Sequence, residues 1–171
     1  WRLTMPLRLA AKAYNRYLRR YIAAIGRRVR GRAPIADTAS VDGLGGLHNV
    51  ALRDAVRTLM LSRLNAFLNS NSQLNLPHSE DPDVSIILVL YNQVEMTYAC
   101  LAAIKECLGD SDLTVETILF DNGSTDRTVA MLDRISGATI SRNDENLHFL
   151  RGVNAAAGAA KGRHILLLNN D

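Results

Sequence analysis

The chain has 171 residues, 47% of them hydrophobic, which is enough for one domain with a buried core. No apolar stretch approaches the roughly 18 residues of a membrane span, and the basic start, which lacks a continuous apolar middle, excludes a signal peptide. The formal net charge of +3 is unevenly spread, because residues 1–33 hold ten Lys or Arg and no acid, whereas the other residues hold 10 bases and 17 acids. This asymmetry indicates an appendage that contacts something anionic.

Residues 1–33 fit a basic amphipathic helix, with Thr4 as its cap and Pro6 in its first turn. Its apolar residues recur at helical spacing: Tyr14, Tyr17, Leu18, Tyr21, Ile22, Ile25 and Val29. Two interpretations lead, a helix that packs on a neighbouring domain and a helix that lies on a membrane surface. Nucleic-acid binding is the weakest of three, because a basic stripe alone is a poor signal.

Residues 34–82 are predicted to form a helical connector followed by a polar linker. The apolar periodicity of residues 48–68 predicts a helix, and the stretch NSNSQLNLPHSEDPD, with its two prolines, is typical of a linker. His48 and His78 have no partner cluster in the sequence, so we expect them to be surface residues and not metal ligands.

Residues 83–171 alternate strand and helix patterns, and the two longest strand runs are continuously apolar. This pattern predicts an α/β fold, an open, mostly parallel sheet with helices on both faces, preceded by the α-helical segments. The expected strands cover residues 84–90, 114–120, 138–141 and 164–168, and the expected helices cover residues 93–108, 125–135 and 150–160.

Local signals predict how these helices begin and how the two cysteines behave. Asn92 is the expected cap of the first helix, with Glu95 completing a capping box, and Thr125 is a good cap for the second. Cys100 and Cys107 on one helix would lie roughly 10 Å apart along its axis, too far for a disulfide. Reduced thiols are consistent with the cytoplasm.

Polar residues follow three of the strands. These sets are Tyr91 and Asn92, residues 121–124, and residues 169–171. Because right-handed crossovers bring the carboxyl ends of parallel strands to one edge, the three sets are expected to converge on one crevice, where such sheets bind ligands. Taken singly, each set is better explained by a helix cap or a turn.

Four stretches, VSIILVLYNQ, ILFDNGSTDRT, ENLHFLRGVNAAAGAAKG and ILLLNND, resemble the family 2 glycosyltransferases in order and spacing. The resemblance covers residues 83–171. It implies a GT-A fold and transfer of a sugar, with inversion, from a nucleotide-diphosphate donor, in glycan or polysaccharide biosynthesis.

The resemblance also implies roles for single residues. Val89 and Tyr91 would contact the nucleobase and ribose, and Asp121 and Asn122 match an acidic pair of which one member accepts the ring N–H of the base. Arg151 and Asn154 lie in a stretch that approaches the base or the diphosphate. Residues 169–171 match a DxD-like motif, in which Asn170 would bind nucleotide and Asn169 and Asp171 would hold Mg²⁺ or Mn²⁺, cations that prefer oxygen ligands.

Three departures from the family pattern stand out. No proline precedes Tyr91, an amide stands at Asn122 where the family has an acid, and His148 replaces the glycine of an Asn-Leu-Gly-Phe stretch. We expect His148 to be an exposed loop residue whose replacement of glycine alters the loop.

An inverting transferase needs a base that takes the proton of the acceptor hydroxyl, and the family's base follows the DxD-like motif. The sequence thus predicts the donor half of an enzyme whose base lies beyond Asp171, with this segment inactive alone. The expected partners are a UDP- or dTDP-type sugar and a glycan or lipid-linked acceptor, at a cytoplasmic location or peripherally at the inner face of the membrane through residues 1–33. The alternatives are a non-catalytic nucleotide-binding or scaffold module, and a basic membrane-surface anchor on an α/β domain.

Overall fold

The computed structural model describes residues 50–109 and 112–170, so the predicted helix of residues 1–33, together with His48 and Asp171, lies outside the described residues. The strands are β1 Leu74–Asn75, β2 Val84–Leu90, β3 Val115–Asn122, β4 Ile135–Ser136, β5 Ala138–Asn143 and β6 His164–Leu167. The helices are α2 Val50–Asn69, α3 Val94–Leu108, α4 Thr128–Leu132 and α5 His148–Ala157. None of these described helices is long and apolar enough to cross a membrane.

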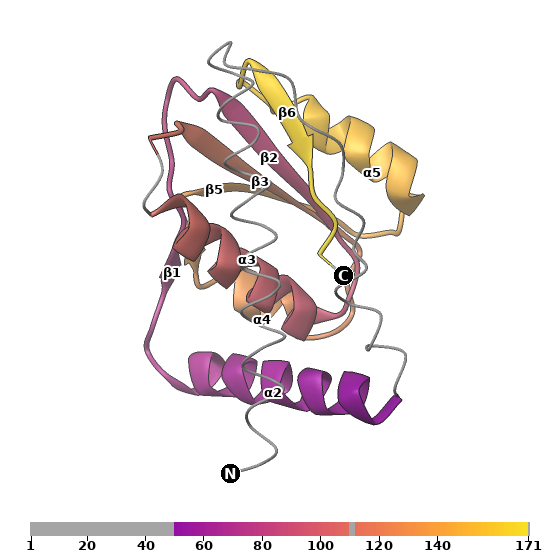
Figure 1. Ribbon diagram of the computed structural model, residues 1–171. Coiled ribbons are helices and arrows are strands. Elements are labelled where there is room, and N and C mark those ends of the chain that lie inside the picture. The colour runs from indigo at the N-terminus through magenta and orange to yellow at the C-terminus, as the bar shows by residue number, and fades with distance from the viewer. Residues whose placement is uncertain (1–49, 110–111, 171) are drawn as a thin grey trace.

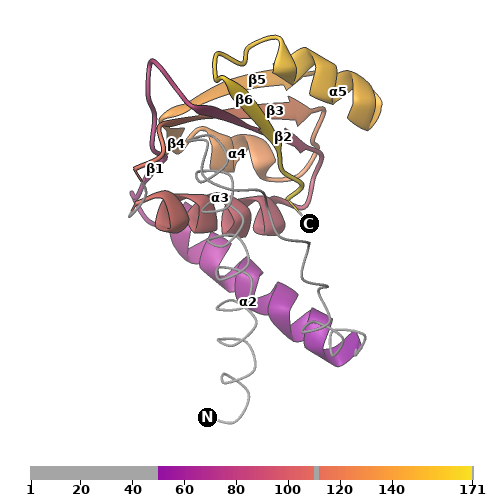
Figure 2. The same cartoon turned by 45° about the horizontal axis from the view of Figure 1, so that its top comes forward.

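Four parallel strands form the central sheet in the order β5-β3-β2-β6. Helices α3 and α4 cover one face, with α2 outside them, and α5 covers the other (Figures 1 and 2). Successive residues of a strand point to opposite faces, and both faces of β2 are covered, so it is apolar except for Ser85. Leu88 is buried in the larger core beneath α3, and Ile87 in the smaller core beneath α5. The predicted α/β fold with a parallel sheet covered on both faces is confirmed.

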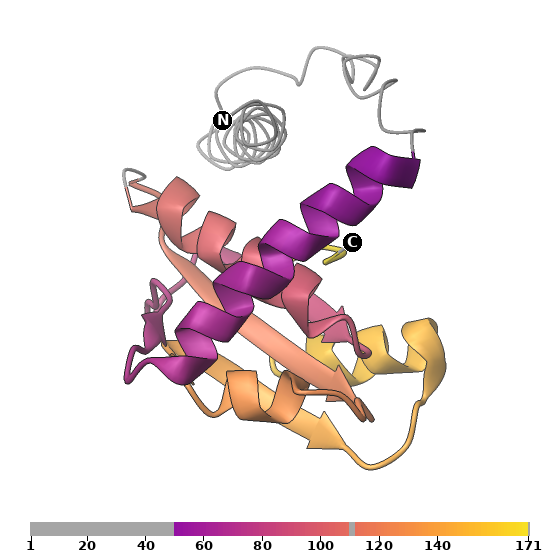
Figure 3. The same ribbon diagram turned by 90° about the horizontal axis from the view of Figure 1, so that it is seen from below.

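Helix α2 and the segment after it share the larger core, although their composition predicted a connector and a polar linker. Leu64 of α2 and Leu74 of β1 are both buried in that core, and the ring of Phe67 stacks on that of Tyr98 in α3, with centroids 4.7 Å apart. Figure 3 shows α2 lying across α3. Apolar residues spaced through a polar stretch are enough to pack it onto the domain.

The second predicted helix, residues 125–135, is shorter than its sequence pattern indicated. The structure limits it to α4, Thr128–Leu132, with Arg127 in place of Thr125 as the cap residue. Ile135 and Ser136 instead form β4, which pairs with β1 in a separate two-stranded parallel sheet. Gly137, at a φ of 72°, follows at once and leads the chain into β5. Pairing with a strand distant in sequence overrides the local helical pattern here.

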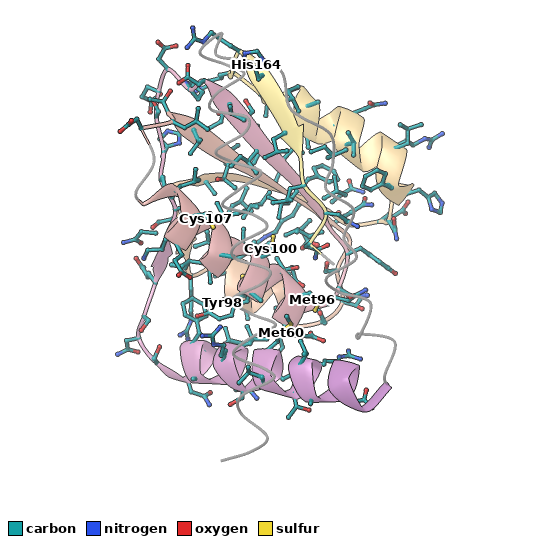
Figure 4. All side chains as sticks on the ribbon, in the orientation of Figure 1. Met60, Met96, Tyr98, Cys100, Cys107 and His164 are labelled. Atoms are coloured by element: carbon teal, nitrogen blue, oxygen red, sulfur yellow. The ribbon has the colours of Figure 1, made fainter. Side chains whose placement is uncertain are left out.

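Cys100 and Cys107 form no disulfide, as their spacing on α3 predicted, and both are buried. Figure 4 labels them on α3, with Met60, Met96 and Tyr98 in the layer between α3 and α2. His164, at the start of β6, marks the amino end of the sheet in the same view. His78 is exposed, as expected, and its ring lies 3.3 Å from the carboxylate of Glu80.

A buried carboxylate closes the turn between α5 and β6. Oε1 of Glu116 accepts hydrogen bonds from the Ser85 hydroxyl at 2.6 Å and from the backbone N–H groups of Lys161 at 2.6 Å and Gly162 at 3.2 Å. Burial by itself raises the pKa of Glu116, but these hydrogen bonds and the nearby Lys161 charge outweigh it, and the pKa is lowered from its ordinary value. The carboxylate thereby fixes the entry into β6.

Candidate donor-binding site at the carboxyl edge of the sheet

The predicted site residues begin where β2 and β3 end side by side. Leu90 pairs in register with Asp121, so Tyr91 and Asn122 are the next positions of adjacent strands. Tyr91 has 49% of its surface exposed, whereas Asp121 and Asn122 are 2% exposed. An aromatic side chain open to solvent thus stands beside two buried polar groups at one edge, as the sequence predicted.

Asp121 holds the loop that follows β3. Its Oδ1 accepts the N–H of Ser124 at 3.0 Å, and the described residues donate no hydrogen bond to Oδ2. Gly123 has a φ of 82°, and a Cβ there would come within 2.9 Å of the Glu145 backbone. The Asn-Gly turn therefore requires its glycine.

Asn122 is occupied by the segment between β5 and α5. Its Oδ1 accepts the N–H of Leu147 at 2.9 Å, and its Nδ2 donates to Oδ1 of Asn146 at 2.9 Å and to the carbonyl of His148 at 3.4 Å. The amide thus ties the end of β3 to the start of α5.

The remaining residues of the DNGSTD stretch brace the loop after β2. Oδ1 of Asn92 accepts the N–H groups of Thr125 at 2.8 Å and Asp126 at 3.2 Å, and the Asn92 N–H donates to Oγ of Ser124 at 2.8 Å. These side chains satisfy backbone N–H groups of two neighbouring loops. The polar residues here therefore fix the conformation of the edge as well as being available to a ligand.

The predicted capping box at Asn92 and Glu95 is wrong. Asn92 and Gln93 have φ values of 55° and 54°, and Gln93, the N-cap residue of α3, makes no side-chain cap hydrogen bond. The cap comes from Asp126, whose Oδ2 accepts the Val94 N–H at 3.0 Å. The loop after β3 replaces the local cap because parallel strands bring the two loops together.

Asp126 also stabilises the start of α4, where its Oδ1 accepts the N–H of Thr128 at 2.9 Å. One carboxylate therefore fixes the first turns of two helices, and an acid near a helix N-terminus is favourable. Sequence analysis missed this role. The only signal was an acid two residues before a helix, and its second partner lies 32 residues earlier in the chain.

Arg151 and Asn154 both lie on α5 and both are exposed. Gly152 and Ala156 are buried against the sheet, and a Cβ on Gly152 would lie 2.9 Å from Cγ1 of Val89. Asn154 follows Gly152 by two residues and precedes Ala156 by two, which places it on the outer side of the helix. Arg151, adjacent to Gly152 in the first turn, is exposed near the end of β2.

The DxD-like stretch follows β6. Asn169 is exposed, and Asn170 donates from Nδ2 to Oγ1 of Thr97 at 2.7 Å, which docks this segment onto α3. Among the described residues, no group of three or more His, Cys, Asp or Glu is placed to hold a metal ion. The oxygen donors of Asn169 and Asp171 suit Mg²⁺ or Mn²⁺ in kind, since such ions often bind one or two protein oxygens and complete their shell with phosphates and water.

A pocket of about 590 Å³ is lined by α2, the start of α3 and the loops that follow β2 and β3. Its charged lining residues are already paired: Arg57 with Glu95, Arg127 with Asn65, and Asp126 with the helix N–H groups. The pocket therefore borders α2 and the loops after β2 and β3, and neither Tyr91 nor Asp121 lines it.

Comparison with known proteins identifies the family. The model of glycosyl transferase family 2 matches residues 85–171. The succinoglycan biosynthesis protein ExoO of Rhizobium meliloti (strain 1021) is 32% identical over 92 residues, which are 53% of this chain and 26% of that protein. The chain thus spans about a quarter of the length of this curated relative.

Among solved structures, the mannosyltransferase PcManGT from Pyrobaculum calidifontis, in complex with GDP-Man and Mn²⁺, is 21% identical with a TM-score of 0.46. The likeness covers 67% of this chain and 35% of that protein. The family match extends over half of the 171 residues and contains every motif at the carboxyl edge of the sheet. This chain belongs to glycosyl transferase family 2.

Proposed function

We propose that this chain provides the donor-binding half of a glycosyltransferase, which transfers a sugar with inversion from a nucleoside diphosphate, of UDP or dTDP type, to a glycan or lipid-linked acceptor. The observation that carries the proposal is that exposed Tyr91 directly follows Leu90, whose partner in the adjacent parallel strand is buried Asp121. Family membership supports sugar transfer, and the name of the relative ExoO supports polysaccharide biosynthesis.

The nucleotide would lie along this edge. Tyr91 offers an aromatic face to the base, and Oδ2 of Asp121 is placed to accept the ring N–H of a uracil or thymine. Val89 would line the site beneath α5, where its Cγ1 packs against Gly152. Arg151 would face the diphosphate, because a guanidinium suits phosphate oxygens, and Asn170 supports this side through Thr97.

A divalent cation would be held by Asp171 and Asn169 together with phosphate oxygens. When bound, such an ion neutralises the charge that develops on a diphosphate leaving group. The chain's own residues orient the nucleotide, and we place the base that takes the acceptor proton in sequence after Asp171. We accordingly expect these 171 residues to bind donor nucleotide without transferring sugar.

Calorimetry with UDP, dTDP and GDP, each with and without Mn²⁺, tests the proposal. We expect UDP and dTDP to bind more tightly than GDP, Tyr91→Ala and Asp121→Asn to weaken binding with or without metal, and Asp171→Ala to remove only the metal-dependent part. Asp81→Ala, an exposed acid in the segment before β2, is the matched control. Failure of all three nucleotides to bind would refute the proposal.

A product assay separates the enzyme from a non-catalytic nucleotide-binding module. The 171-residue chain and a longer chain that includes the sequence after Asp171 would be given the same UDP-sugar and acceptor extract. Transfer by the longer chain alone supports the enzyme, transfer by neither supports the binding module, and transfer by the short chain would show that the base lies within these residues.

A further inference from the structure

Two departures from the family's sequence pattern, Asn122 and His148, meet in the structure. Nδ2 of Asn122 points to the His148 carbonyl at 3.4 Å and to Oδ1 of Asn146 at 2.9 Å, while its Oδ1 accepts the Leu147 N–H at 2.9 Å. With only 2% of its surface exposed, Asn122 is enclosed by this segment. Both the amide oxygen and the amide nitrogen of Asn122 are thus engaged by protein groups, unlike Oδ2 of the equally buried Asp121, to which no described residue donates.

Only an amide fits this set of partners. A carboxylate at position 122 could still accept the Leu147 N–H, but it would face the Asn146 and His148 oxygens with no hydrogen to donate. Asn146 would have to rotate its amide to avoid two opposed acceptors. That rotation would remove Oδ1 from the His148 N–H, which it accepts at 2.8 Å.

The His148 backbone depends on these bonds. Its φ is 60°, a left-handed conformation that glycine adopts without steric cost and histidine does not. The His148 N–H is held by Asn146, which Asn122 orients, and the His148 carbonyl is held by Asn122 itself. Asn122 thus holds both backbone polar groups of His148, directly or through Asn146, in this left-handed conformation.

His148 is the first residue of α5, so its backbone sets where that helix begins. Four residues later Gly152 packs against Val89 and the Asn122 side chain, which leaves Arg151 exposed at the same edge. We propose, resting on the donor-binding function above, that Asn122 is a positioning residue which, paired with His148, holds α5 so that Arg151 meets the diphosphate of the nucleotide.

The experiment compares UDP binding in the presence of Mn²⁺ for the 171-residue chain and its Asn122→Asp, His148→Gly, Asn122→Asp/His148→Gly and Arg151→Ala variants. Asn122→Asp should weaken binding about tenfold, equivalent to about 1.4 kcal/mol, and adding His148→Gly should recover most of the loss, because glycine needs no restraint. Asn69→Asp, the same change at the exposed end of α2, is the matched control.

A double-mutant cycle separates positioning from direct contact. If Asn122 acts through Arg151, Asn122→Asp should cause no further loss once Arg151→Ala is present, because the group it positions is gone. Additive losses, no recovery with His148→Gly, or wild-type affinity in Asn122→Asp would each overturn the proposal. A purely structural role would lower the melting temperature while leaving affinity well below that temperature unchanged.

Amide hydrogen exchange tests whether Asn122 holds the His148 backbone, independently of nucleotide binding. In Asn122→Asp, the His148 amide should exchange faster while the Leu147 amide keeps its protection, since an aspartate still accepts the latter. Equal protection of the His148 amide in both chains would disprove the link. If the wild-type chain binds no UDP, the donor-binding proposal fails, whereas this exchange result still tells whether Asn122 holds His148.

Discussion

Oε1 of Glu95 in α3 lies 2.8 Å from Nε of Arg57 in α2. Glu95 is buried and Arg57 is largely exposed, so the arginine reaches over the carboxylate from an element that precedes the family match. Replacing Arg57 with alanine would leave a buried carboxylate without its charged partner.

We expect Arg57→Ala to lower the free energy of unfolding by about 1–2 kcal/mol, the range for losing a partner of a buried charged group. For a domain of this size each kcal/mol lowers the melting temperature by roughly 2–4 °C. Thermal unfolding should show this loss, and Arg63→Ala, an exposed arginine on the same helix, should not. Equal melting temperatures for all three chains would mean that the Arg57–Glu95 ion pair does not stabilise the packing of α2.

Stability in acid should depend on Glu116. Its pKa is lower in the folded chain than the ordinary value of 4.5, so its ionised form contributes stability that is fully present above pH 4.5 and is lost as the pH falls through the folded pKa. Urea unfolding at a series of pH values should show this loss, and Glu116→Gln should be less stable than wild type at neutral pH, with the difference shrinking in acid. Glu80→Gln, an exposed acid, should follow the wild-type curve.

Gly152 should tolerate no side chain. A Cβ at Gly152 would lie 2.9 Å from Cγ1 of Val89, so Gly152→Ala must push α5 from the sheet, at a typical cost of about 1–3 kcal/mol for overpacking. UDP affinity should fall as well, since Arg151 moves with the helix. Gly158→Ala is the matched control, because a Cβ there finds its nearest atom at 3.5 Å and the backbone is already helical. Equal stability and equal UDP affinity of the two variants would contradict a close packing requirement at Gly152.

Residues 1–33 should bind anionic vesicles weakly through their ten bases. The full chain should pellet with vesicles containing phosphatidylserine, and a chain starting at residue 50 should not. Binding should disappear at 1 M salt, where the Debye length is about 3 Å. Equal pelleting with neutral and anionic vesicles would argue against a membrane-surface role and leave packing on a neighbouring domain.

The sequence by itself determined the α/β class, the parallel order of strands and helices, and the edge at which Tyr91, Asp121 and Asn122 gather. It could do so because the apolar run of β2 and the polar residues after each strand are local patterns, and parallel topology alone brings strand ends together. The absence of a disulfide between Cys100 and Cys107 follows equally from their helical spacing.

Only the tertiary structure decided what the polar side chains at that edge do. Asp126 caps α3 from a different loop, and Glu95 forms an ion pair with Arg57 and not a capping box. Asn122 binds the segment around His148. Each choice depends on a partner 24 to 38 residues away in the chain. A cap motif or an acidic pair in the sequence shows which side chains can form hydrogen bonds. The packing of α2, α5 and the two loops decides which partners those side chains bind.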